Sequence, residues 1–305
     1  MLSSYLRVVQ TLKVCKCMSM LAPELTFGTP DTISNDQGYF GPETITWRIH
    51  SDVMAVVGGV RALFLQALEP RAFGGVQAHS RYREEPFGRL LRTAEYIGVI
   101  SFGTKEEADR AASKVRAMHK ALGLDVPELL LWVHNGFTDS LLDIAMRSGM
   151  NFSKADQDRY VKEQLIAAEL IGLDPAICPS NVDELNDYYE NKRHELIADK
   201  AVRESARFIF LPPMSKFFRY LTPSQIMWAI VVSLSFASLP RWVRKMYGDS
   251  WRGSTLAGPR FADASTNLTL KILRRMLLKL PNKAKKGPHV QAAEIRLKRK
   301  INLVF

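Results

Sequence analysis

Three side chains with the spacing of one helix face, Arg89, Arg92 and Thr93, are the first candidates for chemistry. They stand at positions i, i+3 and i+4, so a helix would place them side by side. Two guanidinium groups and a hydroxyl suit an anionic group or a small polar ligand such as O₂ or a propionate. The alternative is that the arginines make surface ion pairs, which contribute little stability. The glutamates within reach in the sequence are Glu84, Glu85 and Glu95.

The second candidate is His119, which lies in segment 115–123 beside an apolar helical stripe that includes Val115 and Leu122. A neutral imidazole in an apolar, water-poor pocket is what a haem iron needs on its proximal side. The alternative is a hydrogen-bonded core histidine, the commoner role for a lone histidine beside such a stripe. The signatures GxxxxGK[ST], GxSxG and HExxH are missing, as is GxGxxG after a strand. The residue chemistry alone therefore does not identify an enzyme.

The elements that must carry these residues are predicted to be helices. Four capping-box pairs, each a Ser or Thr followed three residues later by an acid or an amide, predict helix starts. They are Thr104/Glu107, Ser153/Asp156, Ser180/Asp183 and Thr222/Gln225. We expect Gly123 and Gly172 to end the helices that follow the first two pairs. Because convincing strand and hairpin patterns are missing, the sequence predicts an all-α fold.

Other segments refine this expectation. Residues 60–68 are apolar nearly all round and predict a central helix, and residues 87–100 and 127–147 also predict helices. Residues 208–211 predict either an extended segment or a helix end. The uncharged residues 221–240 predict a buried helix of a large domain, with a membrane span as the alternative that their serines disfavour.

The positive charge is concentrated at the C-terminus. The 305-residue chain has a formal charge of +11, and the segment from Lys271 to Phe305 holds eleven basic residues and one acidic residue. The rest is nearly neutral, which argues against nucleic-acid binding by the whole protein. We expect an N-terminal extension (1–30), one helical domain (31–280), and a basic tail (281–305) that begins with a flexible linker at 281–288. Three cysteines and no clean secretory signal favour a reducing, cytoplasmic location.

An ordered series of motifs resembles the oxygenase domain shared by latex-clearing proteins (rubber oxygenases) and the MpaB-type oxygenase of mycophenolic acid biosynthesis. The resemblance extends from about Gly41 to Trp251 and implies an all-helical fold that encloses a b-type haem. The series consists of GGVRALFLQALEP (58–70), AHSRY (78–82), GRLLRT (88–93), FGT (102–104), VRAMH (115–119), WVH (132–134), DS (139–140), FLPP (210–213) and RKMYGDSW (244–251).

The resemblance also implies residue roles. His119 would be the axial ligand of the iron and the metal-binding residue. Arg89, Arg92 and Thr93 would lie near the distal pocket as catalytic residues, with Arg89, Thr93 and His79 contacting the cofactor. His79 has a structural role as its alternative.

The chain departs from the family pattern in three places. Arg92 replaces a lysine that can approach the iron in rubber oxygenases, and a guanidinium is a poor ligand, so we expect an open or water-occupied distal site. Glu69–Pro70 stands where many relatives carry His-Pro. The segment between His119 and Trp132 is short, which leaves a cofactor-free member as an alternative.

The remaining chemically interesting residues are assigned structural roles or none. His134 is expected to hydrogen-bond in the core or line the pocket, and Cys178 to be an inert buried thiol. Asp139 and Ser140 are expected to make a local helix-turn bond. Tyr247 and Trp251 are expected to pack in the core. No role is predicted for His50, His194 and His289.

The leading hypothesis is a haem b-dependent oxygenase that uses O₂ on a hydrophobic, alkene-containing substrate. The alternative is a non-catalytic, helical, haem-binding or membrane-peripheral protein. The basic tail, residues 221–240 and the terminal Phe305 motivate this alternative, since basic residues are attracted to anionic lipid surfaces. Nucleic-acid binding by the tail is weaker, because aromatic residues are not interleaved with its charges.

Overall fold

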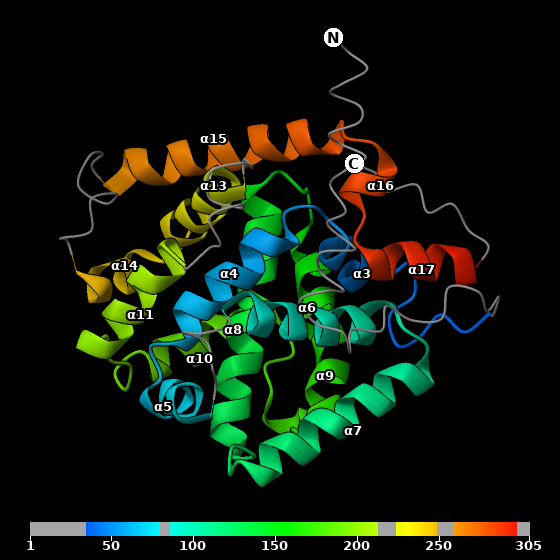
Figure 1. Ribbon diagram of the computed structural model, residues 1–305, viewed down its shortest axis with the longest axis horizontal. Coiled ribbons are helices and arrows are strands. Elements are labelled where there is room, and N and C mark those ends of the chain that lie inside the picture. The colour runs from blue at the N-terminus through cyan, green and yellow to red at the C-terminus, as the bar shows by residue number, and fades with distance from the viewer. Residues whose placement is uncertain (1–34, 80–85, 213–223, 249–258, 298–305) are drawn as a thin grey trace.

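The computed structural model describes residues 35–79, 86–212, 224–248 and 259–297, and every regular element in these ranges is a helix (Figure 1). The predicted all-α fold is confirmed. The helices are α3 (Ile45–His50), α4 (Ala55–Gln66), α5 (Pro70–His79), α6 (Pro86–Phe102), α7 (Lys105–Ala121), α8 (Pro127–Arg147), α9 (Lys154–Leu170), the 3₁₀ turn η1 (Pro175–Ile177), α10 (Val182–Lys192), α11 (Lys200–Phe210), α13 (Ser224–Ala237), α14 (Arg241–Tyr247), α15 (Pro259–Leu278), α16 (Asn282–Lys285) and α17 (Pro288–Arg296).

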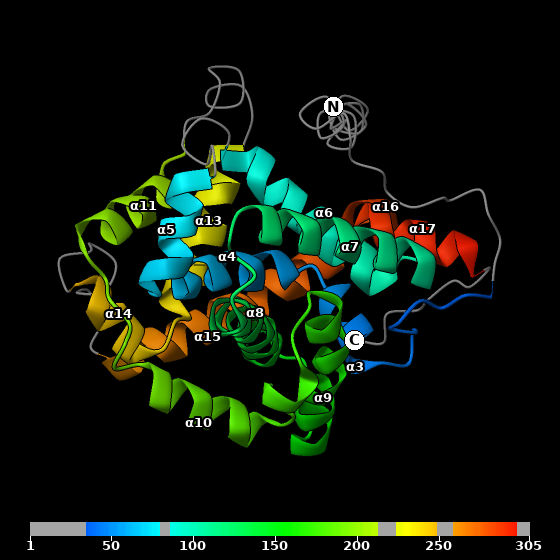
Figure 2. The same cartoon turned by 90° about the horizontal axis from the view of Figure 1, so that it is seen from below.

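Helices α4 and α8 form the centre of the fold, as predicted for residues 60–68 and 127–147. Gly58 allows the two helices to approach closely, because a Cβ atom there would lie 2.7 Å from Cδ2 of Leu141. Trp132 is fully buried and its indole N–H donates to the Gln66 carbonyl at 3.1 Å. On the other side of α4, Ser235 of α13 donates to the Val57 carbonyl at 2.8 Å. Figure 2 shows α8 nearly end-on in the middle of the molecule.

The helix starts follow the predicted caps at two of the four pairs. Capping boxes form at Thr104/Glu107 and Ser153/Asp156, and both predictions are confirmed. The prediction at Ser180/Asp183 is wrong by one residue. Helix α10 begins after Asn181, whose side chain accepts the Glu184 backbone N–H, since asparagine is a strong N-cap in its own right. Thr222 lies outside the described residues.

The predicted helix ends are also found. Gly123 follows α7 with φ +65° and Gly172 follows α9 with φ +93°, both in the left-handed region that favours glycine at this position. Helix α11 ends at Phe210, so the 208–211 segment is a helix end. The C-terminal half of α13 is buried, as expected for the core helix of a large domain.

No single described helix combines the length and apolar character needed to cross a membrane. Helices α13 and α14 meet that standard only as a pair, and the chain bends by 113° between them.

The prediction of a flexible linker at 281–288 is wrong. Residues 282–285 form α16, and α17 packs Val290 and Ala293 against Trp47 and Phe102. The buried Arg296 donates to the Phe102 carbonyl at 2.6 Å, and Lys286 is ion-paired with Glu294. The apolar residues on one face of α17 explain its docking, because burying them removes apolar surface from water.

Candidate functional site

The sequence-predicted site residues lie on a helical hairpin of α6 and α7. The helices are packed neighbours joined by Gly103 and Thr104, so they run antiparallel. Figure 1 shows that they diverge from this turn, so the start of α6 and the end of α7 lie at the open end of the hairpin. Arg89 is near the start of α6 and His119 near the end of α7. The fold therefore brings both to the open end.

His119 has a half-buried ring, and its Nδ1 atom is fully buried with no hydrogen-bond partner among the described residues. Burial lowers the pKa of His119 below its ordinary value, and the opposing effect of the Asp125 carboxylate is smaller. The imidazole is therefore neutral at physiological pH and free of a proton on one nitrogen. The Leu124 backbone N–H donates to the His119 carbonyl at 2.8 Å, which turns the chain toward α8.

The segment after His119 is short, as the sequence indicated. Residues 122–126 alone connect α7 to α8, and Leu124 covers Gly75 of α5, where a Cβ atom would lie 2.7 Å from the Leu124 Cδ2 atom. The connection therefore holds α5 against the end of α7.

Arg92 and Thr93 are both exposed on α6. The predicted helix is confirmed, so positions 89, 92 and 93 share one face. The side chains of Arg89 and His79 lie outside what the structure describes. Met118, next to His119, is 50% exposed. Arg92, Thr93 and Met118 are therefore accessible side chains on the two helices of the hairpin.

A haem group can be tested against these residues. In the part of the chain that the structure describes, no three His, Cys, Asp or Glu side chains gather as a metal-binding group. A haem iron needs only one such protein ligand, because the porphyrin nitrogens also coordinate the iron. His119 offers a neutral imidazole and a buried ring nitrogen that no described protein group satisfies, and a bound ligand is one of the usual reasons for such an atom. Its donor chemistry fits the proximal side of a haem.

The largest polar feature that sequence reasoning missed is an ion-pair cluster between α4 and α8. Arg61 is fully buried, and it donates to Asp139 at 2.6 Å and to the Ser140 hydroxyl at 2.7 Å. Asp143 lies 3.3 Å from Arg61 Nε and pairs with Arg147 at 2.7 Å. Burial opposes the charge of Arg61, but the two carboxylates raise its pKa above the ordinary value. The predicted local bond between Asp139 and Ser140 is therefore wrong, because both side chains bind Arg61 instead.

His50 also has a role that the sequence did not suggest. Its Nδ1 atom lies 2.6 Å from the Ser101 hydroxyl, and its Nε2 atom lies 3.2 Å from the Tyr160 hydroxyl. Burial lowers the pKa of His50 to about 3, so the ring is neutral. Ser101 and Tyr160 are themselves buried, which makes this group a structural link between α3, α6 and α9.

His289 is the other missed histidine. It lies 2.9 Å from Glu95 and packs so closely on Gly98 of α6 that a Cβ atom there would meet its ring at 2.2 Å. His194 is exposed. The signal for His289 was weak, because its partner on α6 is almost 200 residues away in the sequence.

The remaining candidates take ordinary positions. Cys178 is buried, and burial raises the pKa of its thiol to about 11, as expected for an inert cysteine. Burial lowers the pKa of His134 to about 4. Tyr247 donates to the Phe64 carbonyl at 2.5 Å within the core, which confirms its packing role. Trp251 lies outside the described residues.

Comparison with known protein families gives one match. The family described as "ER-bound oxygenase mpaB/B'/Rubber oxygenase, catalytic domain" matches residues 47–266, more than two thirds of the chain. Comparisons with curated proteins and with solved structures found no match. The matched region runs from α3 into α15 and includes the whole α6–α7 hairpin with His119. The chain belongs to the catalytic-domain family of the mpaB and rubber oxygenases.

Proposed function

We propose that this protein is a haem b-dependent oxygenase that uses O₂ to oxidise a hydrophobic, alkene-containing substrate. Its membership in an oxygenase family supports the reaction class. The observation that carries the cofactor is the half-buried, neutral His119 with a ring nitrogen that the described protein atoms leave unsatisfied. When bound, haem supplies an iron atom that can bind and activate O₂.

In this proposal His119 holds the cofactor from the proximal side. Its lowered pKa keeps the imidazole available as a ligand below the pH at which an ordinary histidine becomes protonated. Arg92 and Thr93, with Arg89 on the same helix face, would donate hydrogen bonds to O₂ or to a polar group of the substrate. The exposure of Arg92 and Thr93 supports access for a bulky substrate at the open end of the hairpin.

The test is an absorption spectrum of the purified full chain after addition of haem. We expect a Soret band in the wild type and in His194→Ala, a control that removes an exposed histidine. We expect no Soret band in His119→Ala. A wild type without the band, or a His119→Ala protein that keeps it, would overturn the assignment. Arg92→Ala and Thr93→Val should keep the band and slow O₂ consumption in the presence of an alkene.

Helix α15 favours a second function, contact with an anionic membrane surface. Its apolar side chains Leu268, Ile272 and Met276 are 60%, 46% and 63% exposed and follow each other at intervals of four residues. Such a stripe lies along one side of a helix. Figure 1 shows α15 along the outer edge of the molecule. The basic residues Lys271, Arg275 and Lys279 are also exposed, with the same spacing.

Apolar side chains beside a row of cations are the pattern of a helix that lies in a lipid interface. This surface is a better candidate than the tail, since Lys286 and Arg296 of the tail bind groups of the protein itself. A hydrophobic substrate dissolved in the same membrane would make the two functions compatible.

Vesicle co-sedimentation of the full chain tests the membrane contact. We expect binding to vesicles with anionic lipid, weaker binding to neutral vesicles, and loss of binding in the double variant Ile272→Ser/Met276→Ser. Ile197→Ser is the control, since Ile197 is 53% exposed on another part of the surface. Equal binding of both variants would exclude α15 as the contact. If the double variant keeps its vesicle binding but no longer binds a soluble protein, this face of α15 is a protein contact.

A further inference from the structure

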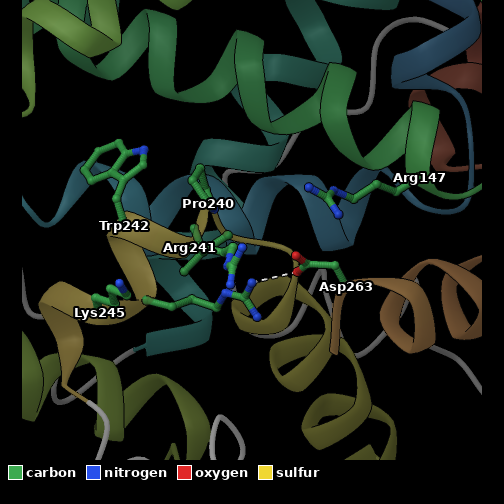
Figure 3. Close-up of a pocket in the computed structure, with 8 residues that line it drawn as sticks. Arg147, Pro240, Arg241, Trp242, Lys245 and Asp263 are labelled. Carbon is green, nitrogen blue, oxygen red and sulfur yellow. Dashed lines mark hydrogen bonds and ion pairs between the residues drawn. The ribbon is translucent and has the colours of Figure 1, made fainter. Parts of the chain in front are cut away.

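A surface pocket lies where the end of α8, the helix α14 and the start of α15 meet (Figure 3). Its volume is about 520 Å³. The polar and aromatic residues that line it are Arg147, Arg241, Trp242, Arg244, Lys245 and Asp263.

The charges of this pocket are unbalanced. Arg147 is already bound to Asp143 at 2.7 Å and to Asn267 at 3.0 Å, and Arg244 is bound to Asp263 at 2.6 Å. Arg241 and Lys245 are exposed and stand four residues apart on α14, so they lie on one face. Asp263 is the one acidic residue among those lining the pocket, and it is occupied by Arg244. Among the described residues, the pocket therefore presents two positive charges, those of Arg241 and Lys245, without an acidic partner.

Arg244 contributes a fixed cation to the wall of the pocket. Its side chain is 12% exposed, and Asp263 holds its guanidinium in place. Its Nε atom is buried and has no hydrogen-bond partner among the described residues. The buried Nε atom is not open to the pocket, but a guanidinium fixed by Asp263 needs little further ordering to contact an acceptor there.

The pocket is distant from the His119 site. Helix α8 spans 21 residues, starting five residues after α7 and ending at Arg147. At a rise of 1.5 Å per residue its two ends are about 30 Å apart. Arg147 and His119 therefore belong to different sites at opposite ends of this helix.

We propose that this pocket binds a phosphate monoester carried on an apolar or planar group. Two surplus cations match a dianion, and a phosphate offers three oxygens to guanidinium donors from different directions. The indole of Trp242 and the neighbouring Leu239 and Pro240 give the pocket an apolar wall for the group that carries the phosphate. The site does not depend on the proposed oxygenase function, and it can be tested on protein without haem.

Calorimetric titration of the full chain with phenyl phosphate tests this site. We expect saturable binding that is tighter than for inorganic phosphate and for benzoate. The pocket variant Arg241→Gln/Lys245→Gln should bind phenyl phosphate at least about tenfold more weakly, since charge-assisted hydrogen bonds are lost. The control variant Lys114→Gln/Lys162→Gln removes two exposed cations elsewhere and should bind as the wild type does.

Trp242→Leu separates the two parts of the ligand. It should remove the preference for phenyl phosphate over inorganic phosphate and leave the binding of inorganic phosphate unchanged. Because Arg241 and Lys245 are exposed, the pocket variant should melt at the wild-type temperature, and Lys245→Met is a milder second variant with a smaller loss.

Two outcomes would overturn the proposal. One is a wild type that shows no saturable binding of phenyl phosphate. The other is equal weakening in the pocket and control variants, which would reveal only a response to net charge. Vesicles with phosphatidic acid distinguish the sources of the phosphate. Binding to them that is lost in the pocket variant assigns a lipid headgroup, and binding of the soluble ester alone assigns a small metabolite.

Discussion

Two regions along α8 differ in how they treat buried polar groups. In its second half, Asp139 and Asp143 pair with Arg61, a fully buried guanidinium whose Nη1 donates to Asp139 and Ser140, although its Nε makes an ion pair without a hydrogen bond. At the chain segment that leads into α8, His119 is half-buried and its Nδ1 atom has no partner among the described residues. Both groups stand on packed helices, but they differ in burial and in hydrogen-bond partners.

The comparison separates polar groups that hold the fold together from those that await a ligand. Buried polar atoms of a stable fold are nearly always paired, so the paired Arg61 is explained by the fold alone. The unpaired His119 is not explained in that way. This difference predicts that mutation of Arg61 lowers the stability of the haem-free protein strongly and that mutation of His119 hardly changes it.

The largest effect is expected for Arg61→Ala. It leaves the carboxylate of Asp139 partly buried without its ion-pair partner, while Asp143 keeps Arg147, and this should lower the free energy of unfolding by about 3–5 kcal/mol. Urea denaturation measures this loss. Arg110→Ala is the control, because its ion pair with Glu106 is exposed and should make no measurable contribution. A loss no greater than in the control would show that the Arg61 cluster does not stabilise the fold.

The next effect concerns pH and His50. The pKa of His50 is about 3 in the folded protein and near its ordinary value of 6.5 in the unfolded chain, so the unfolded state binds the proton more readily. The stability contribution is complete above pH 6.5 and falls by about 1.4 kcal/mol per pH unit below it. His50→Gln should remove about 2 kcal/mol of this loss at pH 5. His194→Gln, an exposed control, should keep the wild-type pH dependence.

A third, smaller effect tests whether the polar groups of the C-terminal segment, like Arg61, hold the fold together. Arg296→Ala leaves the Phe102 and Asp36 carbonyls without their donor, which should cost about 1–3 kcal/mol. Thermal unfolding should show a lower midpoint in one transition. An unchanged midpoint would show that the contacts of Arg296 do not hold this segment to the rest of the fold.

The smallest effect is expected for His119→Leu. Removing the Nδ1 atom, which has no described hydrogen-bond partner, should change the free energy of unfolding by less than about 0.5 kcal/mol in the haem-free protein. His50→Leu, which breaks two hydrogen bonds, is the matched comparison and should destabilise clearly. A similar loss in both variants would make His119 a core histidine and remove the main support for the cofactor site.

The helices were predictable because their signals are local. Capping pairs such as Thr104/Glu107 and terminal glycines such as Gly123 act within a few residues of the chain. Arg61 was missed because its partners are nearly 80 residues away, although an arginine inside an apolar helix requires a counter-charge. The linker prediction for residues 281–288 failed because composition does not reveal α16 or the docking of α17, whose partners Trp47 and Phe102 are far away in the sequence.

The candidate site was only partly predictable. Helical spacing placed Arg89, Arg92 and Thr93 on one face, and the family resemblance singled out His119. Neither indicated how exposed Arg92 and Thr93 would be, since exposure depends on which helices cover α6. The surface pocket at α14 had no local signal, because Arg147 on α8 is about a hundred positions from the lining residues on α14 and α15.

The docking of α17 has a practical consequence for the boundaries of this catalytic unit. The family match stops at residue 266, before α17, yet α17 covers Trp47 and Phe102 and holds α6 through the pair of His289 and Glu95. A fragment trimmed to the matched range would uncover aromatic surface and release the helix that bears Arg92. Expression and crystallisation should therefore keep the sequence through residue 297, and a fused tag at this end should follow a spacer.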